Sequence, residues 1–194
     1  MTLPLTKKHS FDEVFDSKKM FRLILEAMSN PSRIVSINEY ADKLYGNYPA
    51  FLAVAMTLFD NEVSFNTCEN HSLSDEIASL TLAKKEPVET ADFIFVCDLN
   101  HMEYVINNAK CGALADPHKS ATVILYNDGA PACRLRLAGP GINGRPEVQL
   151  TQAVKNAIAI REAQHYEYPQ GVDLFFISGA GELVAIPRLV KVVE

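Results

Sequence analysis

The stretch that decides the fold is VDLFFISGAGELVAIPR, from Val172 to Arg188. It holds two apolar runs separated by Gly179-Ala180-Gly181, and a short glycine turn between two such runs predicts a β-hairpin. Two earlier runs, DFIFVCD (92–98) and ATVILYN (121–127), are apolar throughout, as expected of strands buried on both faces. Buried strands crossed over by helices, together with a late hairpin, predict a mixed sheet in one α/β domain over residues 1–194.

The first helix is predicted from a capping box and from apolar spacing. Ser10 followed by Glu13 is typical of a helix start, and Asn30-Pro31 is expected to end the helix. The apolar residues between these signals fall roughly at helical spacing: Phe11, Val14, Phe15, Phe21, Leu25 and Met28.

The other elements follow from the same rules. Residues 49–60 are apolar nearly all round, with Pro49 suited to a first turn, which predicts a buried helix. Ser72 and Ser74 are candidate caps of a later helix. Three further segments are predicted as a strand at 33–37, a strand at 62–68 and a helix at 148–164.

The segment CRLRLAG (133–139) alternates, with Arg134 and Arg136 on one face and apolar residues on the other. The turn residues Asn127-Asp128-Gly129 precede it, so we predict a hairpin that joins 121–127 to 133–139.

Composition and charge exclude several protein classes. The 194 residues carry 18 basic and 24 acidic side chains, and 18 − 24 gives a net charge of −6, which argues against a nucleic-acid-binding surface. The sequence predicts no membrane span and no signal peptide.

No Cys-x-x-Cys pair occurs, and we predict that Cys68, Cys97, Cys111 and Cys133 are buried, reduced thiols of a cytosolic protein.

The segment GPGING contains Gly139, Gly141 and Gly144 in the literal spacing G-x-G-x-x-G. A dinucleotide-binding turn leads directly from a strand into a helix, whereas Arg145-Pro146 delays a helix here and Pro140 removes one amide. The sequence therefore argues against a dinucleotide site. We expect instead a loop whose amides face a partner, an anion or solvent.

The sequence predicts neither a metal site nor an organic cofactor. The five histidines have no metal-ligand spacing, and only His118, in DPHKS, lies in a polar loop dense enough to suggest a site. A pyridoxal-phosphate lysine is not recognisable, since Lys110, Lys119 and Lys191 lack the expected surroundings.

Anion binding is the better candidate chemistry. If the Gly-Ala-Gly turn is tight, Arg188 and Asp173 lie nearly opposite each other on the hairpin. They form either a structural cross-strand ion pair or a site in which Asp173 orients the guanidinium of Arg188 toward phosphate oxygens. Arg22, on the first helix, is either a solvated arginine or a further ligand residue.

Four motifs in register resemble the PhnH family, whose members are subunits of the bacterial carbon–phosphorus lyase system. They are FRLILEAMSNPSRIV (21–35), LRLAGPGI (135–142), YPQGVDLFF (168–176) and AIPR (185–188). The chain differs from the family pattern at Ser32, where the family commonly has glycine, and at Ala138, Leu189 and Val190, where apolar residues replace threonine or small polar residues and no polar role is expected.

The resemblance implies an α/β/α sandwich whose chain trace is similar to the large domain of pyridoxal-phosphate transferases, without the cofactor. It also implies a homodimer that joins PhnG-, PhnI- and PhnJ-type subunits. Such proteins support transfer of a phosphonate onto the ribose of ATP with release of adenine, so ATP or a phosphonate is a possible ligand. The site residues expected here are Arg188, Asp173, Gly139, Gly141, Arg22 and His118.

Two other functions stay open. One is a stand-alone enzyme that uses the Gly139 loop as an anion nest, and the other is a non-catalytic assembly subunit.

For the homodimer, the C-terminal stretch 182–194 offers an apolar surface, unless it is simply a last core strand. The residues in question are Leu183, Ala185, Leu189, Val190, Val192 and Val193.

Overall fold

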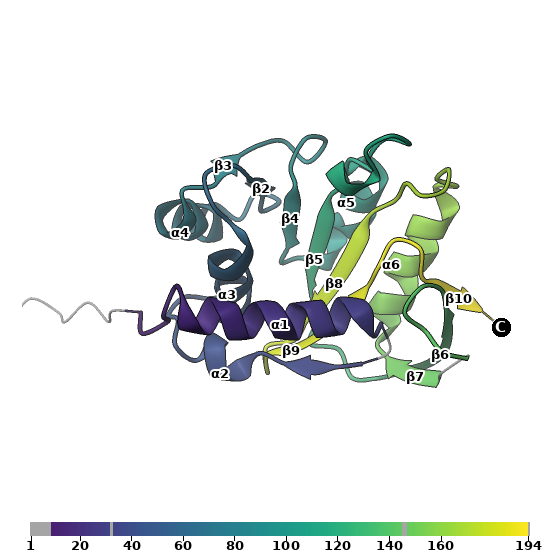
Figure 1. The fold of residues 1–194 in the computed structure, drawn as a ribbon, viewed down its shortest axis with the longest axis horizontal. Helices are drawn as coiled ribbons and strands as arrows, with labels where there is room; N and C mark the ends of the chain where they lie inside the picture. Colours follow the sequence, from purple (N-terminus) through teal and green to yellow (C-terminus); the bar gives the residue numbers. More distant parts are fainter. Residues whose placement is uncertain (1–8, 32, 145–146, 194) are drawn as a thin grey trace, which may run out of the picture.

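The computed structural model of the protein describes residues 9–31, 33–144 and 147–193. Its centre is a seven-stranded sheet (Figure 1). In spatial order the strands are β1 (Val35–Ser36), β9 (Glu182–Ile186), β8 (Asp173–Ile177), β5 (Thr122–Tyr126), β4 (Phe93–Val96), β2 (Ser64–Asn66) and β3 (Lys84–Lys85).

The sheet is mixed, as the sequence predicts. The neighbouring pairs from β8 through β5, β4 and β2 to β3 are parallel, whereas β9 runs antiparallel to both β8 and β1. The hairpin of β8 and β9 pairs Leu174 with Ile186 and Ile177 with Leu183, which confirms the hairpin predicted around Gly179-Ala180-Gly181. Both edge strands are only two residues long.

Helices cover both faces of this sheet. One face packs against α1 (Phe15–Ser29), α2 (Asn38–Ala41), α3 (Pro49–Leu58) and α4 (His71–Thr81), and the other against α5 (Met102–Asn108) and α6 (Gln152–Ala163). Alternate residues of the central strands divide between the two cores: Ile124 faces the first, and Val123 and Leu125 face the second. Short 3-10 turns, η1 (Leu99–His101) and η2 (Pro117–Lys119), precede α5 and β5.

A second sheet has three antiparallel strands, in the order β10 (Lys191–Val193), β6 (Cys133–Ala138) and β7 (Glu147–Leu150). It lies beside α6 at the C-terminal end of the molecule (Figure 1). The predicted hairpin between 121–127 and 133–139 is therefore wrong, because β6 pairs with β7 and β10 and not with β5. Residues 127–132 lead from one sheet to the other, so their turn residues connect the two sheets and do not form a hairpin.

The predicted helix at 148–164 begins later than expected. Residues 147–150 alternate exposed and buried as a strand, and α6 begins only after Thr151, whose hydroxyl accepts a hydrogen bond from the Val154 amide at 3.3 Å. Arg145 and Pro146, which the sequence is expected to place before this helix, lie outside the described residues.

Two predicted helix caps are also wrong. At α1, the Asp12 carboxylate accepts from the amides of Val14 and Phe15, while the Ser10 hydroxyl donates to the Lys43 carbonyl. At α4, Asn70 caps the helix by accepting from the Leu73 amide at 3.1 Å. In both cases a neighbouring Asx side chain fills the role that the sequence assigned to serine.

The buried face of α1 differs from the predicted apolar run. Met20, Ile24 and Ala27 are buried. Four residues of the predicted run are exposed: Val14, Phe15, Phe21 and Leu25. The helix is thus apolar on two sides, and only one of them faces the sheet.

The C-terminal stretch lies mostly in the core. Leu183, Ala185 and Val190 are fully buried, and Leu189, Val192 and Val193 are half-buried. The interpretation as a last core strand is right for β9, so the proposed dimer surface along this strand is not available; Glu194 lies outside the described residues.

Two further predictions concerned the state of the cysteines and the absence of a membrane-spanning helix. All four cysteines are unpaired, but they are half-buried rather than buried. Within residues 9–31, 33–144 and 147–193, no helix has both the length and the apolar character needed to cross a bilayer.

Candidate functional site

Arg188 and Asp173 form a bidentate ion pair at the end of the β8–β9 hairpin. The guanidinium donates from Nη2 to Oδ2 of Asp173 at 2.7 Å and from Nε to Oδ1 at 3.3 Å. The Arg188 amide also donates to Oδ1, at 2.7 Å. Asp173 is the first residue of β8 and is buried, so the rigid sheet holds the carboxylate in place. The sequence correctly predicts that these two residues meet.

The guanidinium of Arg188 retains donors after these contacts. It also donates from Nη1 to the carbonyl oxygen of Pro117, in η2. Arginine has five N–H donors, and these contacts use three, which leaves one on each of Nη1 and Nη2. The Arg188 side chain remains 20% exposed. The geometry is compatible with a structural ion pair and with an oriented anion-binding arginine.

Gly139 and Gly141 bring the loop between β6 and β7 against two other segments. A Cβ atom on Gly139, whose φ is +148°, would lie 2.8 Å from the Leu189 carbonyl oxygen. A Cβ atom on Gly141, whose φ is +80°, would lie 2.6 Å from the Ser29 carbonyl oxygen at the end of α1. The two glycines are needed for close backbone packing beside the residue that follows Arg188. Because this loop joins two antiparallel strands, it is not the strand-to-helix turn of a dinucleotide site.

A cavity of about 370 Å³ is lined by three of the six predicted site residues. Its walls include His118, Asp173 and Arg188, and Pro140 of the glycine loop also lines it, together with Met28 of α1. His118 is exposed at its rim, on the 3-10 turn that also supplies the Pro117 carbonyl. Arg22 is exposed on α1 and does not line this cavity.

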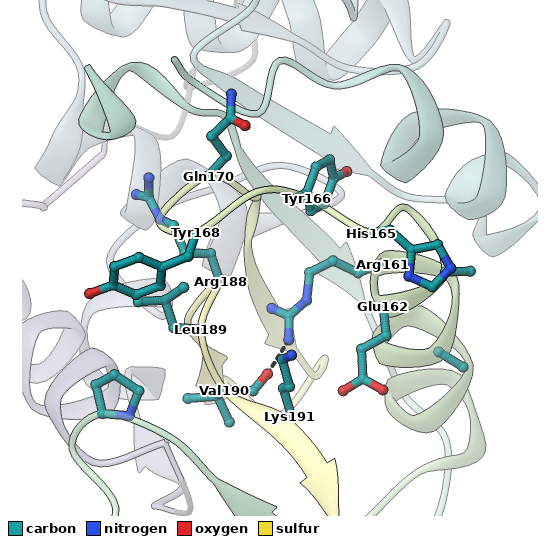
Figure 2. A pocket seen from close by; sticks show the side chains of 13 residues that line it. Arg161, Glu162, His165, Tyr166, Tyr168, Gln170, Arg188, Leu189, Val190 and Lys191 are labelled. Carbon is teal, nitrogen blue, oxygen red and sulfur yellow. Dashed lines mark hydrogen bonds between the residues drawn. The ribbon is translucent and has the colours of Figure 1, made fainter. Parts of the chain in front are cut away.

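A second and larger cavity, of about 950 Å³, shares Pro140, Arg188 and Leu189 with the first. Figure 2 shows Glu162 and His165 of the α6 end on one side of it, and Tyr168 and Arg188 on the opposite side. Further lining residues that the sequence did not single out are Arg161, Tyr166 and Gln170, and Lys191, which the sequence analysis rejected as a cofactor lysine, also lines this cavity. No pattern predicts this set, because it joins the end of α6 to residues about 30 positions later in the chain.

Arg161 reaches from α6 into the backbone around this cavity (Figure 2). Its Nη1 donates to the carbonyl oxygens of Ile186 at 2.9 Å and Pro187 at 3.1 Å, and its Nη2 donates to that of Val190. Burial lowers the pKa of Arg161 to about 10, so the guanidinium is still charged at neutral pH. Arg161 therefore fixes the course of residues 186–190, on which Arg188 lies.

Neither metal nor pyridoxal-phosphate chemistry finds support in the described part of the chain. No group of three His, Cys, Asp or Glu side chains there could hold a metal ion. Lys110 forms an ion pair with Asp92 at 2.5 Å, and Lys119 forms one with Asp116 at 3.0 Å. Function without a cofactor remains a prediction.

Comparison with known proteins agrees with the sequence motifs. The sequence model of a family described as "Bacterial phosphonate metabolism protein (PhnH)" matches residues 9–193. The chain is also similar to the "Putative C-P lyase subunit protein HtxG" of Stutzerimonas stutzeri, with 28% identity over 172 residues. That alignment covers 87% of this chain and 81% of the relative. Because the family match includes both strands of the β8–β9 hairpin and the loop with Gly139, this protein belongs to the PhnH family of bacterial phosphonate metabolism proteins.

Proposed function

We propose that the protein is a subunit of a carbon–phosphorus lyase system that degrades organic phosphonates. The observation that carries this proposal is the family match over 9–193, and the description of HtxG as a C–P lyase subunit supports it. In this role the chain supports transfer of a phosphonate onto the ribose of ATP with release of adenine. It works as part of a cytoplasmic transferase complex and not alone.

The proposed assembly is a homodimer, with a single domain per chain, that binds PhnG-, PhnI- and PhnJ-type subunits. The proposed likeness of its chain trace to the large domain of pyridoxal-phosphate transferases belongs to the same family expectation. Helices on both faces of a mixed sheet are consistent with that likeness.

The proposed ligand site is the Arg188–Asp173 pair, with His118 and the Gly139–Gly141 turn beside it. Asp173 holds the guanidinium from one side, and the two remaining N–H donors face a phosphonate or phosphate oxygen. Arg22 is a separate surface residue in this proposal, because it lines neither of the two cavities that share Arg188.

Replacement of Arg188 by Lys tests the site. Lysine keeps the charge but loses the bidentate fork, so growth on methylphosphonate should be impaired in a strain that depends on this protein. The thermal unfolding midpoint should change by only a few degrees, about what a loss of 1 kcal/mol produces. Arg136→Lys is the matched control, because Arg136 also pairs with a carboxylate, that of Glu147, but at an exposed site on β6. Normal growth of the Arg188→Lys strain would make the pair purely structural.

The exposed face of α1 favours an alternative in which the chain only assembles other subunits. Phe15 and Phe21 are 68% and 50% exposed, and Leu25 on the same helix is 53% exposed. Apolar side chains gathered in this way are typical of protein interfaces. If Phe21→Glu abolishes co-purification with the partner subunits while Arg188→Lys has no effect on growth, the assembly function is the correct one.

A stand-alone enzyme with an anion nest at Gly139 has less support. Gly139 and Gly141 each pack closely on backbone atoms, which accounts for both glycines without a ligand. The purified chain should therefore not turn over ATP with methylphosphonate; turnover by the isolated chain would revive this function.

A further inference from the structure

The larger cavity carries an excess of positive charge. Arg161, Arg188 and Lys191 line it, against one lining carboxylate, that of Glu162, with Asp173 behind Arg188. Three cations face two carboxylates in a chain whose net charge is −6. Both carboxylates are already engaged, because Asp173 binds Arg188 and Glu162 accepts from the Val192 amide at 3.1 Å. The cavity is therefore a local positive site in an acidic protein.

Two basic side chains at this cavity are available to a ligand. Within the part of the chain that the structure describes, neither the Lys191 ammonium nor the His165 imidazole makes a hydrogen bond or an ion pair. Both are exposed. Arg188 lines the opposite side of the same cavity and retains one N–H donor on each of Nη1 and Nη2. Lysine and arginine side chains are the usual partners of phosphate groups in proteins.

The size and lining of the cavity indicate more than a bare phosphate. About 950 Å³ lies in the range of sites for whole small molecules, and a phosphate group fills a small part of it. Ala159, Ala163 and Leu189 supply apolar walls. Tyr168 is 79% exposed, and its ring forms one side of the opening (Figure 2), where it can stack on a planar group.

We propose that this cavity binds a nucleotide-sized ligand that carries a di- or triphosphate group. Lys191 and His165, together with Arg188, bind the phosphates, and Tyr168 stacks on the ring system. The positive charge of the buried Arg161 adds to the attraction for the phosphates. Its hydrogen bonds to the backbone hold Arg188 and Lys191 in position. This inference deepens the proposed function and rests on it only for the choice of ATP as the probe.

Titration of the purified full chain with ATP tests the proposal. Isothermal titration calorimetry should show saturable binding of ATP, weaker binding of pyrophosphate and the weakest binding of adenosine. Lys191→Gln should weaken ATP binding about tenfold, the effect of losing one charge-assisted hydrogen bond. Lys84→Gln is the matched control, since Lys84 is an exposed lysine on β3 at the far edge of the large sheet. Because Lys191 and Lys84 are both exposed, both variants should fold.

A second measurement, the chemical shifts of alanine methyl groups, locates the bound ligand. With labelled alanine methyl groups, ATP should shift the signals of Ala159 and Ala163, whereas the signal of Ala53, buried in the core on the other side of the sheet, should stay unchanged. Absence of ATP binding at millimolar concentration, or equal affinities of the Lys191→Gln and Lys84→Gln variants, would overturn the proposal.

The two proposals fail in different ways. If the chain co-purifies with C–P lyase subunits but does not bind ATP, the cavity inference is wrong and the proposed function stands. If it binds ATP at Lys191 but neither joins those subunits nor supports growth on methylphosphonate, the cavity inference stands and the proposed function is wrong.

Discussion

The two sheets of this protein are built from different kinds of sequence. All five residues of β8 in the large sheet are buried, whereas β6 of the small sheet alternates, with Arg134 and Arg136 outside and Leu135 and Leu137 inside. The large sheet is covered by helices on both faces and forms the core. The small sheet has one exposed face, and its strands hold the Gly139 loop and the segment that follows Arg188. The comparison indicates that the large sheet forms the core and holds Asp173 of the candidate site, whereas the small sheet brings the Gly139 loop beside the segment that follows Arg188.

Removal of a central core side chain should have the largest effect. Ile124 of β5 is fully buried, and Ile124→Ala should lower the free energy of unfolding by about 2–5 kcal/mol through lost burial and a residual cavity. Val148→Ala in β7 of the small sheet removes two methyl groups from a side chain that is 8% exposed, so its cost should be about 1–2 kcal/mol. Urea unfolding measures both values. Equal losses would remove the distinction between the sheets.

Replacement of Arg161 should uncouple the two sheets. Arg161→Met leaves the carbonyls of Ile186, Pro187 and Val190 without their donor, and we expect a loss of about 2 kcal/mol. Hydrogen exchange should show lower protection in β6, β7 and β10 and little change in β5 and β8. Arg134→Met, which alters an exposed arginine of β6, is the control and should affect neither. Uniform loss of protection in both sheets would show that they unfold as one unit.

The smallest expected effect is the acid dependence of the large sheet. Burial raises the pKa of Asp92, but hydrogen bonds from Lys110 and from the Ser64 hydroxyl and amide outweigh it, so that this pKa lies below the usual 3.8. A carboxylate with a lowered pKa stabilises the folded protein above its unfolded pKa, and that stabilisation is lost as the pH falls through the folded pKa.

Asp92→Asn should accordingly remove part of the fall in stability below about pH 4, while lowering stability at pH 7 by under about 1 kcal/mol, since the side chain is partly exposed. Thermal unfolding midpoints between pH 3 and pH 7 measure this. Asp75→Asn, at an exposed ion pair with Lys85, is the control. An unchanged acid slope in the Asp92→Asn variant would contradict the assignment.

The large sheet could be predicted from the sequence because each of its central strands is a continuous apolar run. β4, β5 and β8 correspond to such runs, and the Gly179-Ala180-Gly181 turn identifies β9 as the partner of β8. The meeting of Arg188 and Asp173 follows from that hairpin alone. Local signals were sufficient wherever the partners are close in sequence.

The small sheet could not be predicted in the same way. β7 is four residues long and runs into α6 with only Thr151 between them, so its alternation was read as the beginning of the helix. The pairing of β6 with β10 joins Leu137 to Val192, which no local pattern specifies. The larger cavity depends on that pairing, so the sequence predicted Arg188 as a site residue but did not predict Arg161 or Lys191 as part of the same site.

The apolar residues of α1 show a further limit. Helical spacing predicted the helix correctly, but Phe21 and Leu25 lie outside and Met20 and Ile24 inside. A helix with apolar residues on two sides has no single face that the sequence alone can assign to the core.

The two-residue edge strands of the large sheet affect the self-association of this protein at high concentration. A long open border offers unpaired backbone groups to another chain and encourages growth of intermolecular sheets. Here β3 consists of Lys84 and Lys85, whose charges repel a second copy, and β1 pairs only Val35 and Ser36 with β9. Neither border is long enough to act as a template for fibrils, so the edges of the large sheet should not support the growth of an intermolecular sheet.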